Sequence, residues 1–159
     1  MIKVLFVCMG NICRSPSAEG FFAYALSKSP HQDRVSIDSA GTHSYHVGHA
    51  PDPRAVETAS TFGVDIADLR ARKVNAQDFH DFDFVIAMDQ SNFSDLQAIQ
   101  PEDSRAQLKM MMDYHPEGYP RDVPDPYYGG MDGFTHMCKL LDLATAGLLL
   151  EVENRLKDR

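Results

Sequence analysis

The sequence predicts an α/β fold of three layers, in which helices cover both faces of a four-stranded parallel sheet. Short apolar runs of strand length alternate along the chain with longer segments whose apolar residues recur at helical spacing. Strands that are joined by helices through right-handed crossovers run parallel, so this alternation indicates a doubly wound sheet. Cys8, Ser39 and Asp89 fall at the carboxyl ends of predicted strands, which is where a sheet of this kind binds its ligand.

The composition fits one domain that spans residues 1–159. The chain is 43% hydrophobic and shows no linker, internal repeat or low-complexity tract. Its formal net charge of -8 argues against nucleic acid or an anionic membrane as a partner, because basic surfaces usually bind those. No apolar stretch approaches the roughly 20 residues of a membrane span, and the N-terminal run is too short for a signal peptide. We expect a cytoplasmic protein that is a monomer or a weak dimer.

The first strand and the first helix are the most clearly marked elements. Ile2–Cys8 is nearly continuously apolar, as in a strand that is buried on both faces of a parallel sheet. Ser15–Ser29 is predicted as a helix with an apolar stripe formed by Ala18, Phe22, Ala25 and Leu26. We expect Ser15 to be the N-cap, Pro16 to occupy the first helical position and Glu19 to complement the helix dipole.

The rest of the chain continues the alternation. Further strands are predicted over Val35–Ser39, Phe84–Met88 and Gln107–Met110. The predicted helices are one capped by Asp52 that ends near Phe62, a short one that begins near Asn75, Ser91–Ile99 and Gly133–Leu156. Residues 111–130 contain several prolines and little periodicity, so we expect a long functional loop there.

The segment that directly follows the first strand is suited to binding an anion. It reads Cys8-Met9-Gly10-Asn11-Ile12-Cys13-Arg14-Ser15 and leads into the first helix. Backbone N–H groups of a short turn can converge on one anion at the positive end of a helix. The same field and Arg14 favour the thiolate form of Cys8, and the planar guanidinium suits two phosphate oxygens. The alternative is a buried cysteine at a strand end beside a surface arginine.

This motif resembles the signature of the low-molecular-weight protein tyrosine phosphatases, which is a cysteine, five residues, an arginine and a serine or threonine near the N-terminus. Asp125-Pro126-Tyr127-Tyr128-Gly129-Gly130 is similar to the acid loop of that family, although taken alone it would read as a turn before the last helix. Further matches are Ser39-Ala40-Gly41-Thr42, Pro51-Asp52-Pro53-Arg54-Ala55 and Ala87-Met88-Asp89. The resemblance, to a bacterial-type member, covers essentially the whole chain and implies a phosphotyrosine phosphatase I-like fold.

The resemblance implies hydrolysis of phosphotyrosine and small aryl phosphates through a phosphocysteine on Cys8, with Asp125 as general acid and then general base. Arg14 and the loop residues Met9, Gly10, Asn11, Ile12, Cys13 and Ser15 would bind the phosphate. Ser15 would also donate to the sulfur, Asn11 would adopt a left-handed backbone, and Ser39 and Asp89 would support the loop. Tyr45, Tyr127 and Tyr128 would wall the cleft. The implied partners are a tyrosine-phosphorylated protein or peptide and inorganic phosphate as product, with no cofactor and no metal.

Two positions bear on how this chain compares with its relatives. Many relatives have a histidine where this chain has Leu69, and that histidine helps to fix the asparagine that corresponds to Asn11. In relatives that hydrolyse phosphoarginine, a threonine occupies the position of Ile12. The bulkier and apolar isoleucine therefore implies a preference for a flat phenyl ring.

The cysteines and histidines outside the motif allow several interpretations. Three cysteines do not form a disulfide framework and fit a reducing compartment. Cys13 lies five residues from Cys8, so it either forms a reversible protective disulfide with Cys8 or serves only in packing, whereas Cys138 is predicted to be core. A metal site at His43, His46 and His49 is disfavoured, because Gly41, Gly48 and Pro51 interrupt any helix that would align them.

Two alternative functions remain at this point. An arsenate reductase of the same fold would use the same loop but needs two more cysteines near the middle of the chain, and residues 65–137 contain none. A non-catalytic phosphotyrosine-binding module would keep the loop without turnover, which the presence of Cys8, Arg14 and Asp125 disfavours.

Overall fold

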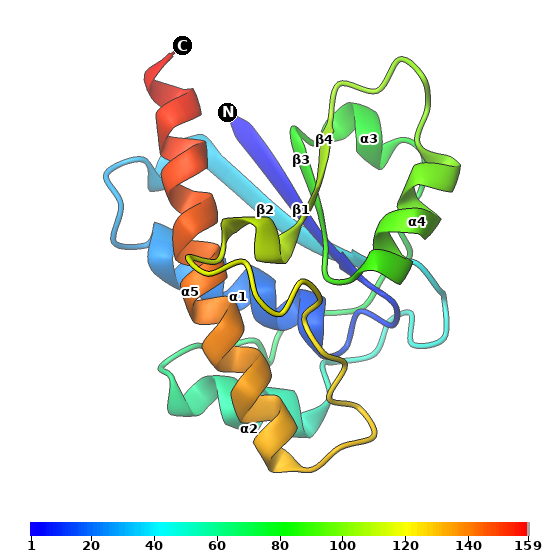
Figure 1. Cartoon of the computed structure of the whole chain (residues 1–159), viewed down its shortest axis with the longest axis vertical. Coiled ribbons are helices and arrows are strands. Elements are labelled where there is room, and N and C mark those ends of the chain that lie inside the picture. The colour runs from blue at the N-terminus through cyan, green and yellow to red at the C-terminus, as the bar shows by residue number, and fades with distance from the viewer. Residues whose placement is uncertain (159) are drawn as a thin grey trace.

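The computed structural model describes residues 1–158 and contains one four-stranded parallel sheet (Figure 1). Its strands are β1 (Ile2–Cys8), β2 (Val35–Gly41), β3 (Phe84–Ala87) and β4 (Gln107–Met110), in the order β2-β1-β3-β4. The α-helices are α1 (Arg14–Leu26), α2 (Pro53–Thr61), α3 (Asp78–Asp81), α4 (Gln90–Ile99) and α5 (Met131–Lys157). Two 3-10 helices, η1 (Gln32–Arg34) and η2 (Met111–Tyr114), complete the elements. The predicted doubly wound α/β fold is therefore confirmed.

Two buried clusters hold the three layers together, one on each face of the sheet. Alternate side chains of β1 divide between them, since Val4 and Phe6 belong to one cluster and Leu5 and Val7 to the other. The first cluster joins the sheet to α1, α2 and α5, and the second joins it to α3 and α4 (Figure 1). All four of these side chains are fully buried, which explains why β1 is apolar without alternation.

The start of α1 differs from the prediction in its capping. The helix begins at Arg14, and Cys13 occupies the N-cap position without a side-chain hydrogen bond. Ser15 is not the N-cap, because its hydroxyl lies within the preceding loop, 3.1 Å from the Cys8 sulfur. Glu19 does not complement the dipole from the first turn. Its side chain is half-buried beside Ser39, and desolvation raises the pKa of Glu19.

The other predicted elements are present with shifted ends. Asp52 caps α2 as predicted, because its carboxylate accepts a hydrogen bond of 2.9 Å from the backbone N–H of Arg54. The segment 111–130 begins with η2 rather than as a loop, since Met111 and Met112 are buried under α5. Gly147 of α5 permits this packing, because a Cβ there would overlap the carbonyl oxygen of Tyr114. Within residues 1–158, none of the helices combines the length and the apolar character that a membrane span needs.

Candidate active site

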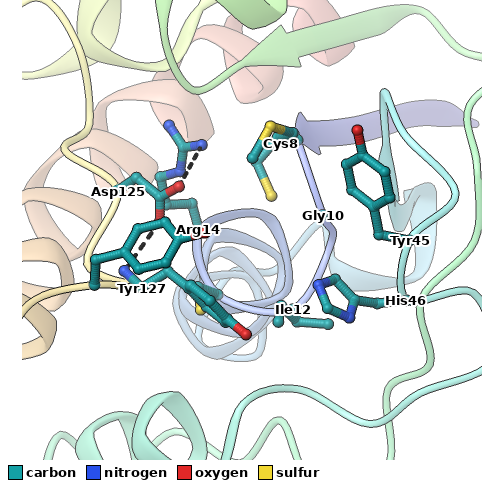
Figure 2. A pocket seen from close by; sticks show the side chains of 11 residues that line it. Cys8, Gly10, Ile12, Arg14, Tyr45, His46, Asp125 and Tyr127 are labelled. Carbon is teal, nitrogen blue, oxygen red and sulfur yellow. Dashed lines mark hydrogen bonds and ion pairs between the residues drawn. The ribbon is translucent and has the colours of Figure 1, made fainter.

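A cavity of about 300 Å³ lies at one edge of the sheet. The carboxyl ends of β1 and β2 meet there with Met88 and Asp89, which follow β3. We call residues 8–15 the cysteine–arginine loop and residues 122–130 the Asp125 loop. The cavity is lined by Cys8, Met9, Gly10, Ile12, Cys13, Arg14, Tyr45, His46, Asp125, Tyr127 and Tyr128. Figure 2 shows Asp125 and Tyr127 on one side of Cys8, and Tyr45 and His46 on the other.

The sulfur of Cys8 is held by two polar groups of its own loop. The backbone N–H of Asn11 donates to it at 3.3 Å, and the Ser15 hydroxyl lies at 3.1 Å. Asn11 has a positive φ of 57°, which turns the backbone so that its N–H faces back toward Cys8. Hydrogen-bond donors at this position can stabilise negative charge on the sulfur when it departs as a leaving group.

The side chain of Asn11 fixes the loop from behind through three hydrogen bonds. Its amide nitrogen donates to the hydroxyls of Ser15 at 2.7 Å and Ser39 at 3.0 Å, and its oxygen accepts from the backbone N–H of Arg72 at 3.0 Å. Leu69 packs half-buried against the core. Asn11 is therefore supported from this segment by the backbone N–H of Arg72, and a histidine at position 69 is not required.

The residues that end and follow β2 pack directly against the cysteine–arginine loop. Thr42 and His43 donate backbone hydrogen bonds to the carbonyls of Cys8 and Met9, at 2.9 and 3.0 Å. Because the N–H of a trans peptide points opposite to its C=O, these bonds direct the following N–H groups away from β2. Gly41 makes the contact possible, since a Cβ there would lie 2.7 Å from the Met9 carbonyl oxygen.

Arg14 links the cysteine–arginine loop to two distant segments. Its guanidinium is buried and donates to the Asp89 carboxylate at 2.5 Å and to the Val123 carbonyl at 3.2 Å, while Nη2 lies 3.6 Å from Asp125. Burial by itself would lower the pKa of Arg14, but the nearby Cys8 and Asp89 outweigh it and raise that pKa. The guanidinium therefore remains a fixed positive charge at the base of the cavity.

Asp125 is half-exposed and lies above this charge. One of its carboxylate oxygens accepts a hydrogen bond of 3.1 Å from the backbone N–H of Tyr127, and the other faces Arg14 (Figure 2). A carboxyl group in this position can give a proton to, or take one from, a group bound over Cys8.

Aromatic rings form the mouth of the cavity. Tyr45 stacks on His43 with ring centroids 5.2 Å apart, and Tyr127 meets Tyr128 edge to face at 4.9 Å. His46 lies on the side of Tyr45, with its ring centroid 6.3 Å from that of Tyr127. Flat rings around an apolar opening are suited to a flat apolar group on the ligand.

The remaining cysteines differ in their position relative to the cavity. Cys8, Cys13 and Cys138 are free and buried, and Cys13 faces the same cavity as Cys8. Burial, with smaller contributions from Asp52 and Cys8, raises the pKa of Cys13 far above its usual value. Cys138 lies on the buried face of α5, where burial raises its pKa to about 12.

The structure thus gathers every residue that the sequence predicted for the site around one cavity or directly behind it. Reasoning from the sequence missed three further residues. Val123 contributes only a carbonyl, which has no sequence signal. His46 lines the cavity, whereas the sequence suggests for it only a disfavoured metal site. Within residues 1–158, no group of three His, Cys, Asp or Glu side chains is arranged to hold a metal ion. In the sequence Arg54 is marked only as part of a segment that matches the family, whereas in the structure it contacts the Asp125 loop.

Comparisons with known proteins give the same pattern. A family model described as low molecular weight phosphotyrosine protein phosphatase matches residues 3–158. The chain is 46% identical over 134 residues to the low molecular weight phosphotyrosine protein phosphatase of Schizosaccharomyces pombe, covering 84% of this chain and 85% of that protein. It is 37% identical over 153 residues to the low molecular weight protein-tyrosine-phosphatase YfkJ of Bacillus subtilis, covering 96% and 97%.

Solved structures extend this similarity to three dimensions. A protein tyrosine phosphatase from Entamoeba histolytica superposes with a TM-score of 0.93 at 36% identity, covering 97% of this chain and 98% of that one. The Drosophila arginine phosphatase DARP superposes with a TM-score of 0.88 at 32% identity, covering 95% and 98%.

Proposed function

The chain belongs to the low-molecular-weight phosphotyrosine protein phosphatase family and hydrolyses phosphotyrosine with release of phosphate; from this premise we propose that Cys8, Arg14 and Asp125 carry the reaction. The observation that supports the assignment is their convergence on one cavity, with Nη2 of Arg14 3.6 Å from the Asp125 carboxylate and with Cys8 beside both (Figure 2). The proposed phosphate cradle consists of the loop residues Met9, Gly10, Asn11, Ile12, Cys13 and Ser15.

In the first step the Cys8 thiolate attacks phosphorus in line with the phenolic oxygen. A bond forms between sulfur and phosphorus while the bond from phosphorus to the phenolic oxygen breaks, and protonated Asp125 gives its proton to that oxygen. Arg14 and the backbone N–H groups hold the three equatorial oxygens as charge moves across the phosphoryl group. Tyrosine leaves and a phosphocysteine remains.

In the second step water replaces sulfur on the phosphorus atom. Asp125, now a carboxylate, takes a proton from the attacking water, and the electrons of the phosphorus–sulfur bond return to Cys8 as a thiolate. The Asn11 N–H and the Ser15 hydroxyl, at 3.3 and 3.1 Å from the sulfur, stabilise the departing thiolate. Inorganic phosphate is released, and no metal ion takes part in these steps.

A trapping experiment tests this mechanism. Rapid mixing with excess aryl phosphate should give a burst of phenol equal to the enzyme concentration, and acid quenching should yield a phosphorylated peptide that contains Cys8. Vanadate should inhibit competitively, and activity should persist in a metal chelator. Phosphate on a different residue, or loss of activity with the chelator, would contradict the proposal. Absence of turnover with intact phosphate binding would favour the non-catalytic module instead.

The proposed substrate is a phosphotyrosine side chain in a protein or peptide, with the rings of Tyr45, Tyr127 and Tyr128 around its phenyl group. The buried Ile12 lines the cavity and adds to its apolar wall. An arsenate reductase is disfavoured, because residues 65–137 of this chain contain no cysteine to relay a disulfide.

Reversible oxidation is a proposed form of regulation. Peroxide would oxidise the Cys8 thiolate to a sulfenic acid, and the Cys13 thiol would condense with it, forming the S–S bond and releasing water. Mild peroxide should therefore inactivate the enzyme in a way that added thiol reverses, whereas Cys13→Ser should proceed to irreversible acids. Peptide mapping that links Cys8 to Cys138 would contradict this pairing.

Three broader expectations accompany the function as proposals. The two clusters that pack on opposite faces of one sheet support a single catalytic domain over residues 1–159. The three free thiols fit a reducing, cytoplasmic environment. We further propose that the protein is a monomer or weak dimer. The net charge of -8 favours the absence of a nucleic acid or membrane partner.

A further inference from the structure

We propose that Arg54 is a positioning residue that holds Asp125 over Cys8 by tying the Asp125 loop to the cysteine–arginine loop. The inference rests on the proposed role of Asp125 as general acid and assigns a function to a residue outside the cavity lining. Arg54 lies in the first turn of α2, which is neither of the two loops that carry the reacting groups.

One end of the link is fixed to the cysteine–arginine loop through Asp52. The backbone N–H of Asp52 donates to the carbonyl of Ile12 at 2.9 Å. The Asp52 carboxylate accepts from Arg54 three times, from the backbone N–H at 2.9 Å, from Nε at 3.1 Å and from Nη2 at 2.8 Å. These bonds lower the pKa of Asp52, so the pair stays ionised and the guanidinium is held in one orientation.

The other end of the link reaches the Asp125 loop. Nη2 of Arg54 donates to the carbonyl of Tyr127 at 2.9 Å, and Nη1 donates to that of Gly129 at 3.4 Å. The guanidinium carbon lies 4.7 Å from the centroid of the buried Phe134 ring and 5.6 Å from that of Tyr127. Since the N–H of Tyr127 is the donor to Asp125, fixing the carbonyl of Tyr127 also fixes the partner of the carboxylate.

The Asp125 loop is anchored at Val123, whose N–H donates to the carbonyl of Met88 at 2.8 Å and whose carbonyl accepts from Arg14 at 3.2 Å. The contact between Arg14 and Asp125 itself, two residues further on, is weaker. Nη2 of Arg14 is 3.6 Å from the Asp125 carboxylate, which is beyond the range of a good hydrogen bond. The segment from 122 to 130 has no helix or strand of its own. A misplacement of about 1 Å can cost about 10²-fold in rate, so the orientation of this loop should limit proton transfer. A lysine could not replace Arg54, because one ammonium cannot bond a carboxylate and two carbonyls in a single plane.

The test compares Arg54→Met and Arg54→Lys with Arg70→Met as a matched control. Arg70 is an exposed arginine that also donates to loop carbonyls, those of Ala67 and Leu69, but contacts neither active-site loop. We expect kcat/KM of Arg54→Met, which reports the step in which the phenol leaves, to fall about tenfold or more for phenyl phosphate, and by less than about threefold for an activated aryl phosphate that needs little protonation. Arg54→Lys should be similarly impaired, and Arg70→Met should match the wild type.

Two further measurements separate positioning from a general loss of structure. The inhibition constant of vanadate should stay within about twofold of wild type, because the cradle is intact. In an Asp125→Asn background, Arg54→Met should cause no additional loss, since the proton that it positions is already absent. Far-ultraviolet circular dichroism should show that Arg54→Lys is folded at the assay temperature.

Three outcomes would overturn the inference. Equal losses in kcat/KM across the leaving-group series would show a structural effect, and losses that multiply in the double variant would show that Arg54 acts independently of Asp125. Wild-type kinetics in Arg54→Lys and Arg54→Met would show that the link is not needed. If Asp125→Asn itself retained full activity with phenyl phosphate, the proposed acid would be wrong and Arg54 would have no proton donor to position.

Discussion

The cysteine–arginine loop and the Asp125 loop face the same cavity but are built in opposite ways. The first is contiguous in sequence and buried, and hydrogen bonds within the loop and from β2 fix it on several sides. The second is largely exposed, and Tyr128 retains 93% of its accessible surface. Arg14 and Arg54 hold this second loop from outside. The difference indicates that phosphate binding and proton transfer are separable functions, and substitutions should affect them independently.

The largest effect is expected for Cys8→Ser, which removes the nucleophile and leaves the cradle in place. Hydrolysis of aryl phosphates should fall by more than about 10⁴-fold, because a hydroxyl is a much poorer nucleophile than a thiolate. Phosphate binding should remain measurable by calorimetry. Turnover within tenfold of the wild-type rate would refute the covalent role.

Asp125→Asn should give the next largest effect and shows the contribution of the other loop. The amide keeps the shape but has no transferable proton, so losses of about 10² to 10⁴ are expected. The loss in kcat/KM should be greater for aryl phosphates whose phenol has a high pKa than for activated ones, while vanadate affinity is retained. A uniform loss across the series would exclude Asp125 as the acid and make Asp122 the next candidate.

Ile12→Thr should alter the choice of substrate more than the rate. Threonine is smaller and adds a hydroxyl to the cavity wall, and such changes contribute about 1–3 kcal/mol. The ratio of phosphoarginine to phosphotyrosine hydrolysis should therefore rise about tenfold or more. This ratio is measured for the wild type and for the variant on matched peptides. An unchanged ratio, or a wild-type preference for phosphoarginine, would show that specificity does not depend on this position.

Leu69→His should have the smallest effect on activity. Asn11 already accepts from the Arg72 backbone, so a histidine has no vacant role, and kcat/KM should stay within about twofold of wild type. Loss of apolar burial should instead lower the free energy of unfolding by about 1 kcal/mol in urea denaturation. A gain in activity of tenfold or more would mean that the hydrogen bonds of Asn11 do not suffice.

The sequence predicted most of the fold and the cysteine–arginine loop because their signals are local. The bounds of β1 and β4 agree with prediction, and Asp52 caps α2. The capping role of Ser15 was predicted wrongly, since a sulfur seven residues away competes for its hydroxyl. The contacts of Val123 and Arg54 could not be predicted, because they use backbone carbonyls brought together only by the folded chain.

The preformed turn at Asn11 has a consequence for how the enzyme behaves as product accumulates. Its side chain is fixed by protein groups alone, the hydroxyls of Ser15 and Ser39 and the backbone of Arg72, so the order of the loop does not depend on a bound anion. A site that is organised before binding holds the released oxyanion nearly as readily as the oxyanion group of the substrate. Inorganic phosphate should therefore compete with the substrate, and the phosphate already present in the surroundings should inhibit turnover at all times.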